Sequence, residues 1–238
     1  MSPRFSPLIA ILLSVAAVAV AQEGFRSGPQ PAAPGKPFVK IPQSFQAHLF
    51  NGKFVDRYHD VVGEHDFFPT VLLFANVPAE GKEAPLKSLL GKLDELIEKY
   101  RPMDQYPEAA NFSAYAVFLS PAAQNSLTKV DVKDPAALVK EATDRRALYA
   151  QLTEWAKPLK KVVVGTCVPE SVDQYKLNPQ AELTVLYYES FNVLENFAFA
   201  DGKFGEENVA PIVAKIDERL QAKIAVLEKA RRQKLRKK

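Results

Sequence analysis

The chain has 238 residues, of which 47% are hydrophobic and 25% charged, so it is long enough to form one sizeable core. Cys167 is its single cysteine, which excludes an internal disulfide. The formal net charge of +3 conceals an asymmetry, because residues 229–238 contain seven Lys or Arg side chains and no acidic one.

The first 40 residues predict two segments that lie outside the folded domain. Residues 1–21 have the pattern of a signal peptide: Arg4, an apolar run from Leu8 to Val20, and a small-x-small cleavage site ending at Ala21. A retained membrane anchor is the alternative, although the run is shorter than the ~20 residues that a span needs. Residues 22–40 are rich in proline and glycine, which predicts a flexible linker. We therefore expect an extracytoplasmic protein, in the periplasm, in the cell envelope or secreted.

The domain is expected to begin at residue 41 with a hairpin and a buried strand. Residues 44–50 and 53–58 are two short strand patterns, and Asn51 and Gly52 between them are typical of a tight turn. Residues 68–76 then form a strand with a continuous apolar centre, as in a strand covered on both faces.

A loop at residues 77–83 separates that strand from an amphipathic helix over residues 84–100. The apolar residues of this helix recur three and four positions apart, which predicts one buried face. They are Leu86, Leu89, Leu90, Leu93, Leu96, Ile97 and Tyr100.

The remaining chain alternates strands and helices. Asp144 is expected to cap a helix that ends near residue 160, and a helix is expected to begin near Glu206, where acidic residues suit its positive end. The other predicted elements are a strand at 114–120, a polar insertion at 121–140, a strand at 162–167, a short helix at 170–177 and a hairpin at 181–189 and 193–200. This alternation predicts an α/β domain with helices on both faces of a sheet.

The element order and the residues around the first helix resemble the thioredoxin-like fold superfamily. A buried strand ending in Phe74 and Ala75, a short loop, and a helix with Pro85 in its first turn are similar to the active-site unit of that superfamily. The resemblance covers residues 41–220 and lies closest to alkyl hydroperoxide reductase/thiol-specific antioxidant-like and thioredoxin-like domains. It implies a central mixed sheet flanked by helices, followed here by a long basic C-terminal helix and tail at residues 221–238.

The resemblance also shows what this sequence lacks. Thioredoxins carry Cys-x-x-Cys in the loop, and peroxiredoxins carry Pro-x-x-x-Thr-x-x-Cys, but here Val77 and Glu80 stand at the cysteine positions. Thioredoxins also place a cis-proline just before the next sheet strand, whereas Pro179 lies two or three residues too early. Since the thiolate is missing, Val77, Glu80 and Lys82 are candidates for a binding site in this loop instead of a redox centre, and a solvated loop is the simpler interpretation.

Other chemistry-bearing residues are sparse. Cys167 is the one candidate for a catalytic thiol, and the simpler interpretation is a buried structural cysteine. His48, His59 and His65 show no metal-ligand spacing, so no metal site is expected. We find no nucleotide-binding loop and no hydrolase or zinc-protease motif, and we expect no cofactor.

Three functions fit these observations. The leading hypothesis is an exported, redox-inactive binding or scaffolding module, not an enzyme, with a protein or envelope partner that the sequence does not identify. The first alternative is a peroxiredoxin-like antioxidant or thiol-disulfide oxidoreductase that uses Cys167. The second is an envelope-associated structural protein whose residues Lys229 to Lys238 bind an anionic surface. Nucleic acid is disfavoured as a partner by export, and no transmembrane span is expected in the mature chain.

Overall fold

The computed structural model describes residues 24–63, 67–103, 105–123 and 134–236. The predicted signal peptide and His65 lie outside the described residues. The described strands are β1 (Gln46–Leu49), β2 (Tyr58–Asp60), β3 (Thr70–Asn76), β4 (Ser113–Leu119), β5 (Val163–Cys167), β6 (Ala181–Glu189) and β7 (Asn192–Ala200). The helices are α1 (Ala84–Tyr100), α2 (Pro107–Ala110), α3 (Pro135–Ala156) and α4 (Glu206–Arg236), with short 3-10 helices η1 (Pro121–Ala123) and η2 (Pro169–Tyr175).

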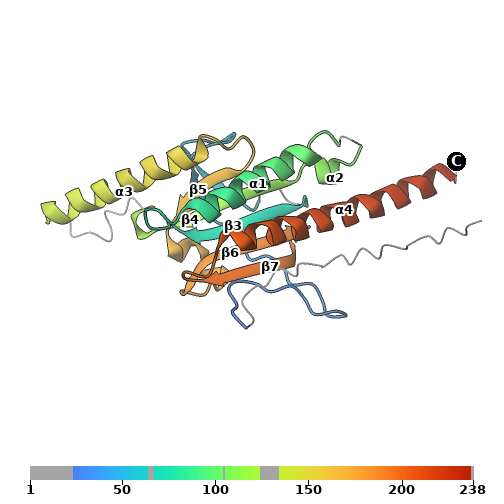
Figure 1. The fold of residues 1–238 in the computed structure, drawn as a ribbon, viewed down its shortest axis with the longest axis horizontal. Helices are drawn as coiled ribbons and strands as arrows, with labels where there is room; N and C mark the ends of the chain where they lie inside the picture. The colour runs from blue at the N-terminus through green and yellow to red at the C-terminus, as the bar shows by residue number, and fades with distance from the viewer. Residues whose placement is uncertain (1–23, 64–66, 104, 124–133, 237–238) are drawn as a thin grey trace, which may run out of the picture.

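The strands form one mixed sheet of seven strands in the order β2-β1-β5-β4-β3-β6-β7 (Figure 1). Strands β3, β4 and β5 run parallel, whereas β6 and β7 form an antiparallel hairpin on one side and β1 and β2 form one on the other. The predicted α/β class with a central mixed sheet is confirmed. The parallel strand-helix-strand unit, the antiparallel hairpin beside it and the final helix make the fold thioredoxin-like, as the resemblance implied.

Three helices cover one face of the sheet and build the larger core. Helix α1 has the predicted bounds and the predicted buried face, with Pro85 in its first turn. It lies beside α4 over the central strands, and the second half of α3 packs through Leu148, Leu152 and Trp155 (Figure 1). The local 3.6-residue period was sufficient to predict α1, because its buried face is apolar throughout apart from Asp94.

The opposite face of the sheet carries a smaller core. Helix η2 covers it with Val172 and Tyr175, and Phe45 packs edge-on against Tyr175 with 5.6 Å between ring centroids. Cys167 belongs to this core. Helices therefore flank both faces, although the long ones all lie on one side.

The N-terminal segment of residues 24–41, which we call the strap, is bound to the sheet where a flexible linker was expected. Ser27 is only 2% exposed. The hydroxyl of Thr184 donates to its Oγ at 2.6 Å, and the amide of Asn196 donates to its carbonyl oxygen at 2.8 Å. The prediction of a flexible linker over residues 22–40 is therefore wrong for this part of the strap. No apolar pattern indicates this attachment in the sequence, because polar side chains make it.

The first hairpin also differs from its prediction. Strands β1 and β2 are shorter than expected and are joined by residues 50–57 instead of a two-residue turn. Asn51 donates its Nδ2 to the carbonyl oxygen of Val162 at 2.9 Å and accepts from the Val164 N–H at 2.8 Å. The amide thus continues the hydrogen bonding of β5 beyond β1, which the turn propensity of Asn-Gly did not reveal.

Helix α3 begins earlier than predicted because Asp134 caps it. The Asp134 Oδ1 accepts from the Ala136 and Ala137 N–H groups at 3.0 and 3.1 Å, and Pro135 occupies the first helical position. Asp144, the predicted cap, lies inside the helix and pairs with Lys140. The first half of α3 projects away from the sheet (Figure 1).

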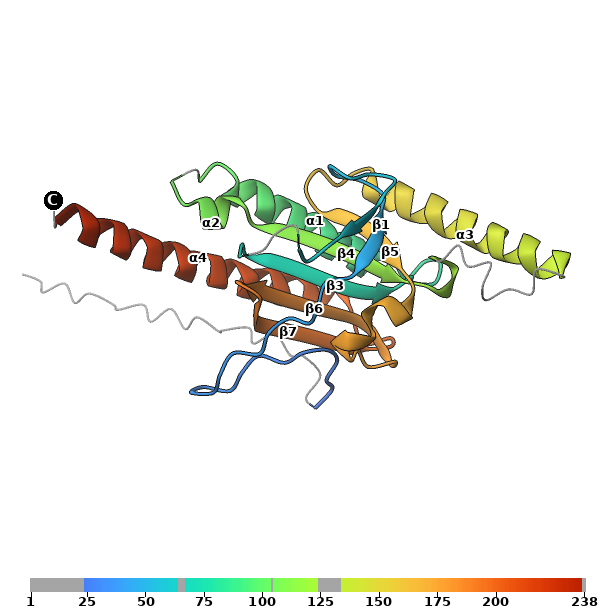
Figure 2. The same cartoon turned by 180° about the vertical axis from the view of Figure 1, so that it is seen from behind.

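Helix α4 begins at Glu206 as predicted and continues for 31 residues without interruption. Its first half packs on the sheet, and its second half leaves the body of the molecule (Figure 2). Ile224 and Leu227 still pack against the larger core, so the expected boundary after residue 220 does not separate a folded domain from a tail. Among the described helices, none combines the length and the apolar character needed to cross a bilayer.

Candidate functional site

The loop that the resemblance singled out follows β3 directly. Val77 is partly buried against the larger core, whereas the side chains of Glu80 and Lys82 are exposed. The Lys82 N–H donates to the Ala79 carbonyl at 3.0 Å, and Gly81 takes the positive φ of 82° that this turn requires. The structure therefore keeps these candidates on one short loop but does not bring them together around a cavity.

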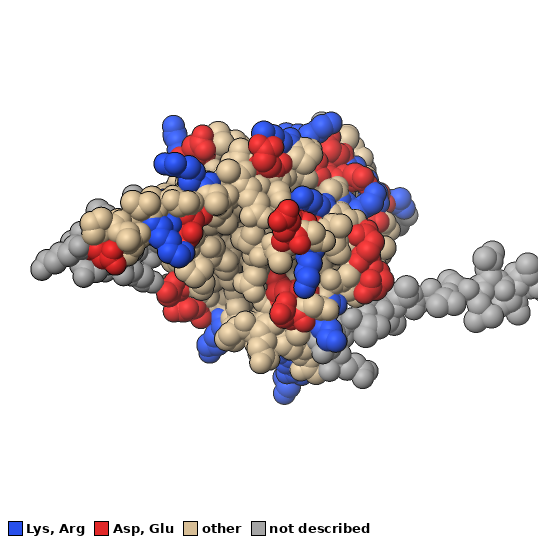
Figure 3. All heavy atoms as spheres, turned by 60° about the vertical axis from the view of Figure 1, so that its left-hand side comes forward, with Lys and Arg blue, Asp and Glu red and all other residues tan. Residues whose placement is uncertain are grey.

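A pocket of about 340 Å³ lies next to this loop, at the carboxyl ends of β3 and β4. Ligand sites of open α/β sheets form where parallel strands end, so this is the expected place for one. Its floor is apolar, with Phe74, Leu119 and Val172, and its rim carries Asn76, Asp173, Lys176 and Asn178. Figure 3 turns this end of the molecule forward and shows charged side chains around a central area of uncharged residues.

The rim of the pocket is held by the connection from η2 to β6. Lys176 ends η2 in the left-handed region, with φ of 52°. The Asn178 N–H then donates to the Ser27 hydroxyl of the strap at 3.0 Å, and its Nδ2 donates to the Arg26 carbonyl at 3.2 Å. At the β3 side of the pocket, the Asn76 Nδ2 donates to the carbonyl of Ala181, the first residue of the neighbouring strand β6, at 3.1 Å. The strap and β6 thus fix the walls, while the side chains of Asp173 and Lys176 are exposed.

Sequence reasoning approached this pocket but missed most of its lining. In the segment before β6, Pro179 was the one residue considered, as a possible counterpart of the family's cis-proline. Its peptide bond is trans, since no described bond is cis. Pro179 does line the pocket, together with Leu177 and Asn178. Their sequence carries no motif, and the signal that could have found them is their position before β6, where the family places its cis-proline.

Cys167 is separated from the loop and does not line the pocket, although its strand neighbour Leu119 does. It ends β5 beside Leu119 of β4, which in turn lies beside Asn76 of β3, so two strand spacings or about 10 Å separate Cys167 from the start of the loop. Its side chain is 3% exposed, and burial raises the pKa of the thiol to about 12. The thiol therefore stays protonated at neutral pH.

The described histidines take part in ring stacking. His48 stacks on Tyr149 with 4.7 Å between ring centroids, and His59 stacks on Phe54 at 3.8 Å. Burial lowers the pKa of His48, although the charge of Asp56 opposes the shift. Among residues 24–63, 67–103, 105–123 and 134–236, no group of three His, Cys, Asp or Glu side chains could hold a metal ion.

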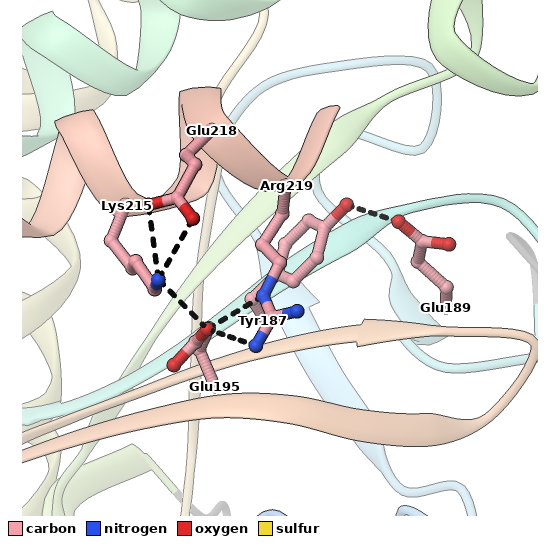
Figure 4. A network of polar contacts seen from close by, with 6 residues as sticks. All are labelled: Tyr187, Glu189, Glu195, Lys215, Glu218 and Arg219. Carbon is pink, nitrogen blue, oxygen red and sulfur yellow. Dashed lines mark hydrogen bonds and ion pairs between the residues drawn. The ribbon is translucent and has the colours of Figure 1, made fainter. Parts of the chain in front are cut away.

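A second polar cluster lies between α4 and the β6-β7 hairpin (Figure 4). The Tyr187 hydroxyl donates to Glu189 at 2.5 Å, while Glu195 of β7 accepts from Arg219 at 2.6 Å and lies 4.0 Å from the Lys215 Nζ. Tyr187 is fully buried, and burial together with Glu189 raises its pKa. These contacts attach α4 to the sheet, so we assign the cluster to structure and not to ligand binding.

Comparison with known proteins adds similarities at the level of structure only. No protein-family model and no curated protein sequence matches the chain. Among solved structures, yeast Sco1 is similar at 12% identity and a TM-score of 0.43, covering 79% of this chain and 97% of that chain. Reduced Prx3 from Vibrio vulnificus matches at 11% identity and a TM-score of 0.40, over 76% of this chain and 98% of that chain. Copper-bound Arabidopsis thaliana ScoI matches at 12% identity and a TM-score of 0.41, over 74% and 98%. At these values, nothing about chemistry is transferred from them.

Proposed function

We propose that this chain is a redox-silent binding module that holds its ligand in the pocket at the carboxyl ends of β3 and β4. The observation that carries the proposal is the pocket itself, which has an apolar floor and a polar rim and lies where the loop after β3 offers no thiol. Such a combination is typical of small-ligand and side-chain binding sites.

The state of Cys167 supports the redox-silent part of the proposal. Peroxide reduction and disulfide exchange both need an accessible thiolate. The Cys167 thiol is 3% exposed with a raised pKa, and it does not line the pocket. A reaction at this thiol would first require η2 to move, because Val172 and Tyr175 share its core.

The lining of the pocket favours one class of ligand, an apolar side chain carried on a peptide. Leu119 and Leu177 offer partly buried apolar surface, and Asn76, Asp173 and Lys176 stand at the rim where a peptide backbone would lie. A volume of about 340 Å³ accommodates one large side chain. We therefore expect a protein partner that inserts a leucine or an aromatic residue.

Binding is tested with N-acetyl amides of leucine and phenylalanine as probes, and N-acetylglycinamide as the matched probe without a side chain. We expect the first two to perturb the amide NMR signals of Asn76, Lys176 and Leu177, and the glycine derivative to leave them unchanged. Leu119→Trp fills the pocket and should abolish the perturbation. Equal responses to all three probes, or a response that survives Leu119→Trp, would contradict the pocket as the site.

Redox silence is tested separately by intact mass during a hydrogen peroxide titration, with Cys167→Ser as the control. We expect no stoichiometric gain of oxygen and no disulfide-linked dimer. Rapid oxidation of Cys167 at one equivalent of peroxide would overturn this part of the proposal and favour the antioxidant alternative.

Export is also part of the proposal, and it rests on the pattern of residues 1–21. Cell fractionation followed by N-terminal sequencing tests it. A chain that begins at Gln22 in the extracytoplasmic fraction is the expected result, whereas a cytoplasmic chain that keeps Met1 would contradict it.

A further inference from the structure

The end of the molecule opposite the pocket exposes phenyl rings. Phe38 of the strap is 64% exposed, and Phe67, which precedes β3, is 66% exposed. Phe67 contacts Phe191 in the β6-β7 turn, with 5.7 Å between ring centroids. We call Phe38, Phe67 and Phe191 the phenyl patch. At such exposure Phe38 and Phe67 gain little from the core of this chain, so local packing does not explain them, whereas Phe191 is partly buried against the smaller core.

The backbone that carries the phenyl patch is firmly attached. The Ser190 N–H donates to the Phe67 carbonyl at 3.2 Å, and the Ile41 N–H donates to the Phe191 carbonyl at 2.7 Å. Lys40 forms an isolated bridge with Asn192, which ties the strap to the start of β7. The rings are thus presented on fixed positions and not on a loose loop.

Phe191 anchors Phe67 from a turn with an unusual backbone conformation. Its φ is 63°, in the left-handed region where glycine or asparagine is preferred and a bulky residue is unfavourable. Ser190 before it also has a positive φ, of 48°. Glycine or asparagine would suit this turn better, so the ring is placed here for its packing against the smaller core and on Phe67.

The basic half of α4 leaves the body at this same end. The Lys223 Nζ binds Glu189 at 3.1 Å, and Glu189 is the last residue of β6, directly before the turn that holds Phe191. Ile224 and Leu227 still pack against the larger core, and from Lys229 the helix continues for 8 residues to Arg236, which is about 12 Å at 1.5 Å per residue (Figure 2). This half contains the exposed basic residues Lys229, Arg231, Arg232 and Lys234.

Apolar side chains are interspersed with these charges. Val226 and Leu235 of α4 are each 66% exposed, and Val39 beside Phe38 is 38% exposed. Glu228 pairs with Arg232 at 3.7 Å, and from residue 229 onward the chain contains no further carboxylate side chain. One end of the molecule thus combines an excess of positive charge with exposed aromatic and aliphatic groups.

We propose that this end binds an anionic lipid surface, with the basic half of α4 held by the headgroups and the phenyl patch inserted among them. Basic residues near such a surface each strengthen binding by about fivefold, and aromatic rings favour the headgroup region. The aliphatic side chains of Val39 and Leu235 are compatible with lipid but cannot stack on nucleic-acid bases, so they favour a lipid surface as the partner. The inference rests on the proposed export, which brings the chain to an envelope membrane, and it is independent of the pocket.

The test is co-sedimentation with vesicles, using the chain from Gln22 onward, because an uncleaved apolar run would bind lipid by itself. Vesicles of phosphatidylcholine alone are compared with vesicles of equal parts phosphatidylcholine and phosphatidylglycerol, at low and high salt. We expect binding to the anionic vesicles only, with affinity that falls steeply as salt rises. Absence of binding to the anionic vesicles at low salt would overturn the proposal.

Two sets of variants separate the parts of the surface. Changing Lys229, Arg231, Arg232 and Lys234 to Gln together should weaken binding by at least about tenfold. The matched control changes four other exposed lysines to Gln, Lys92, Lys140, Lys157 and Lys203, and should keep most of the binding. An equal loss in the two sets would show a net-charge effect and would contradict a docking end.

The phenyl patch is tested by Phe38→Ser with Phe67→Ser, two exposed positions whose change should leave thermal unfolding unaltered. We expect the binding that survives high salt to be lost in this variant. Binding that the two changes do not alter would contradict insertion of the phenyl patch. A single-stranded oligonucleotide is added as a competitor at equal phosphate concentration. If it displaces the vesicles, the partner is a nucleic acid instead of a lipid, and the proposal is overturned.

Discussion

The carboxylate of Asp94, in the middle of α1, accepts the backbone N–H of Lys161 at 2.6 Å, just before β5 begins. The same side chain also accepts the N–H groups of Lys160 and Val162, at 3.2 and 2.8 Å. Asp94 is only 9% exposed and is the one acidic residue on the otherwise apolar face of α1. Its carboxylate accepts hydrogen bonds from three N–H groups of another segment. This contact fixes the chain at the entry to β5.

Replacing Asp94 by Ala should lower the free energy of unfolding by about 3 kcal/mol, because three N–H groups lose a charged acceptor. Asp94→Asn keeps one oxygen acceptor and should lose less. Urea denaturation measures both. Glu95→Ala, at the exposed neighbouring position, serves as the control and should change stability by less than about 0.5 kcal/mol. Equal effects at positions 94 and 95 would contradict this role.

Elements whose stability is local were the ones that the sequence predicted best. Helix α1 and strand β6 have the expected bounds, since an amphipathic period and a short run rich in β-branched and aromatic residues are visible in one window of sequence. The start of α3 was missed because Asp134 and Asp144 are equally good caps in isolation. Asp134 is followed by Pro135, which suits the first helical position, and that pair decided the outcome.

Contacts between distant segments could not be predicted in the same way. Ser27 meets Thr184, and Asn51 meets Val162 and Val164, through single polar groups that carry no periodic signal. The pocket is of this kind as well, since its walls come from strand ends and from the connection before β6. The resemblance of the strand-loop-helix unit to the family's active-site unit led to the neighbourhood of the pocket but not to most of its lining.

The strap should contribute measurably to stability. Ser27→Ala leaves the Asn178 N–H without its acceptor and the Thr184 hydroxyl without its partner, and the expected loss is about 2 kcal/mol. Limited proteolysis should also cut the strap faster in this variant. Ser171→Ala, at a partly exposed position of η2, is the control. If Ser27→Ala unfolds like the unchanged protein, the strap is not bound in solution.

The burial of Cys167 predicts both its reactivity and a pH dependence. A chromogenic disulfide reagent should label the thiol only after denaturation. Because burial raises its pKa from 9.0 to about 12, the folded state keeps a proton that the unfolded state releases. Its contribution to stability is therefore complete below about pH 9 and is lost as the pH rises toward 12. Cys167→Ala should show a shallower decline than the unchanged protein between neutral pH and pH 10. Parallel curves, or fast labelling of the native protein, would refute the buried thiol.

Asp217 should give the opposite pH dependence. This carboxylate of α4 binds the Lys99 Nζ and the Tyr100 hydroxyl of α1, at 2.7 and 2.6 Å. Burial opposes its ionisation, but the hydrogen bonds from Lys99 and Tyr100 outweigh it, and the pKa of Asp217 lies below its ordinary value of 3.8. The contribution of Asp217 is present above that value and is lost as the pH falls through the lower pKa of the folded state.

Asp217→Asn should therefore destabilise the protein at neutral pH, and the difference from the unchanged protein should shrink as the pH falls below about 4. Thermal unfolding across the acid range measures this. Glu218→Gln is the matched control, because its side chain is 66% exposed and pairs only with Lys215 among the described residues. A difference that stays constant with pH would mean that the charge of Asp217 does not hold α4 against α1. The packing of Leu220 and Ile216 and the ion pairs of Arg219 and Lys223 with the β6-β7 hairpin would then attach that part of the helix.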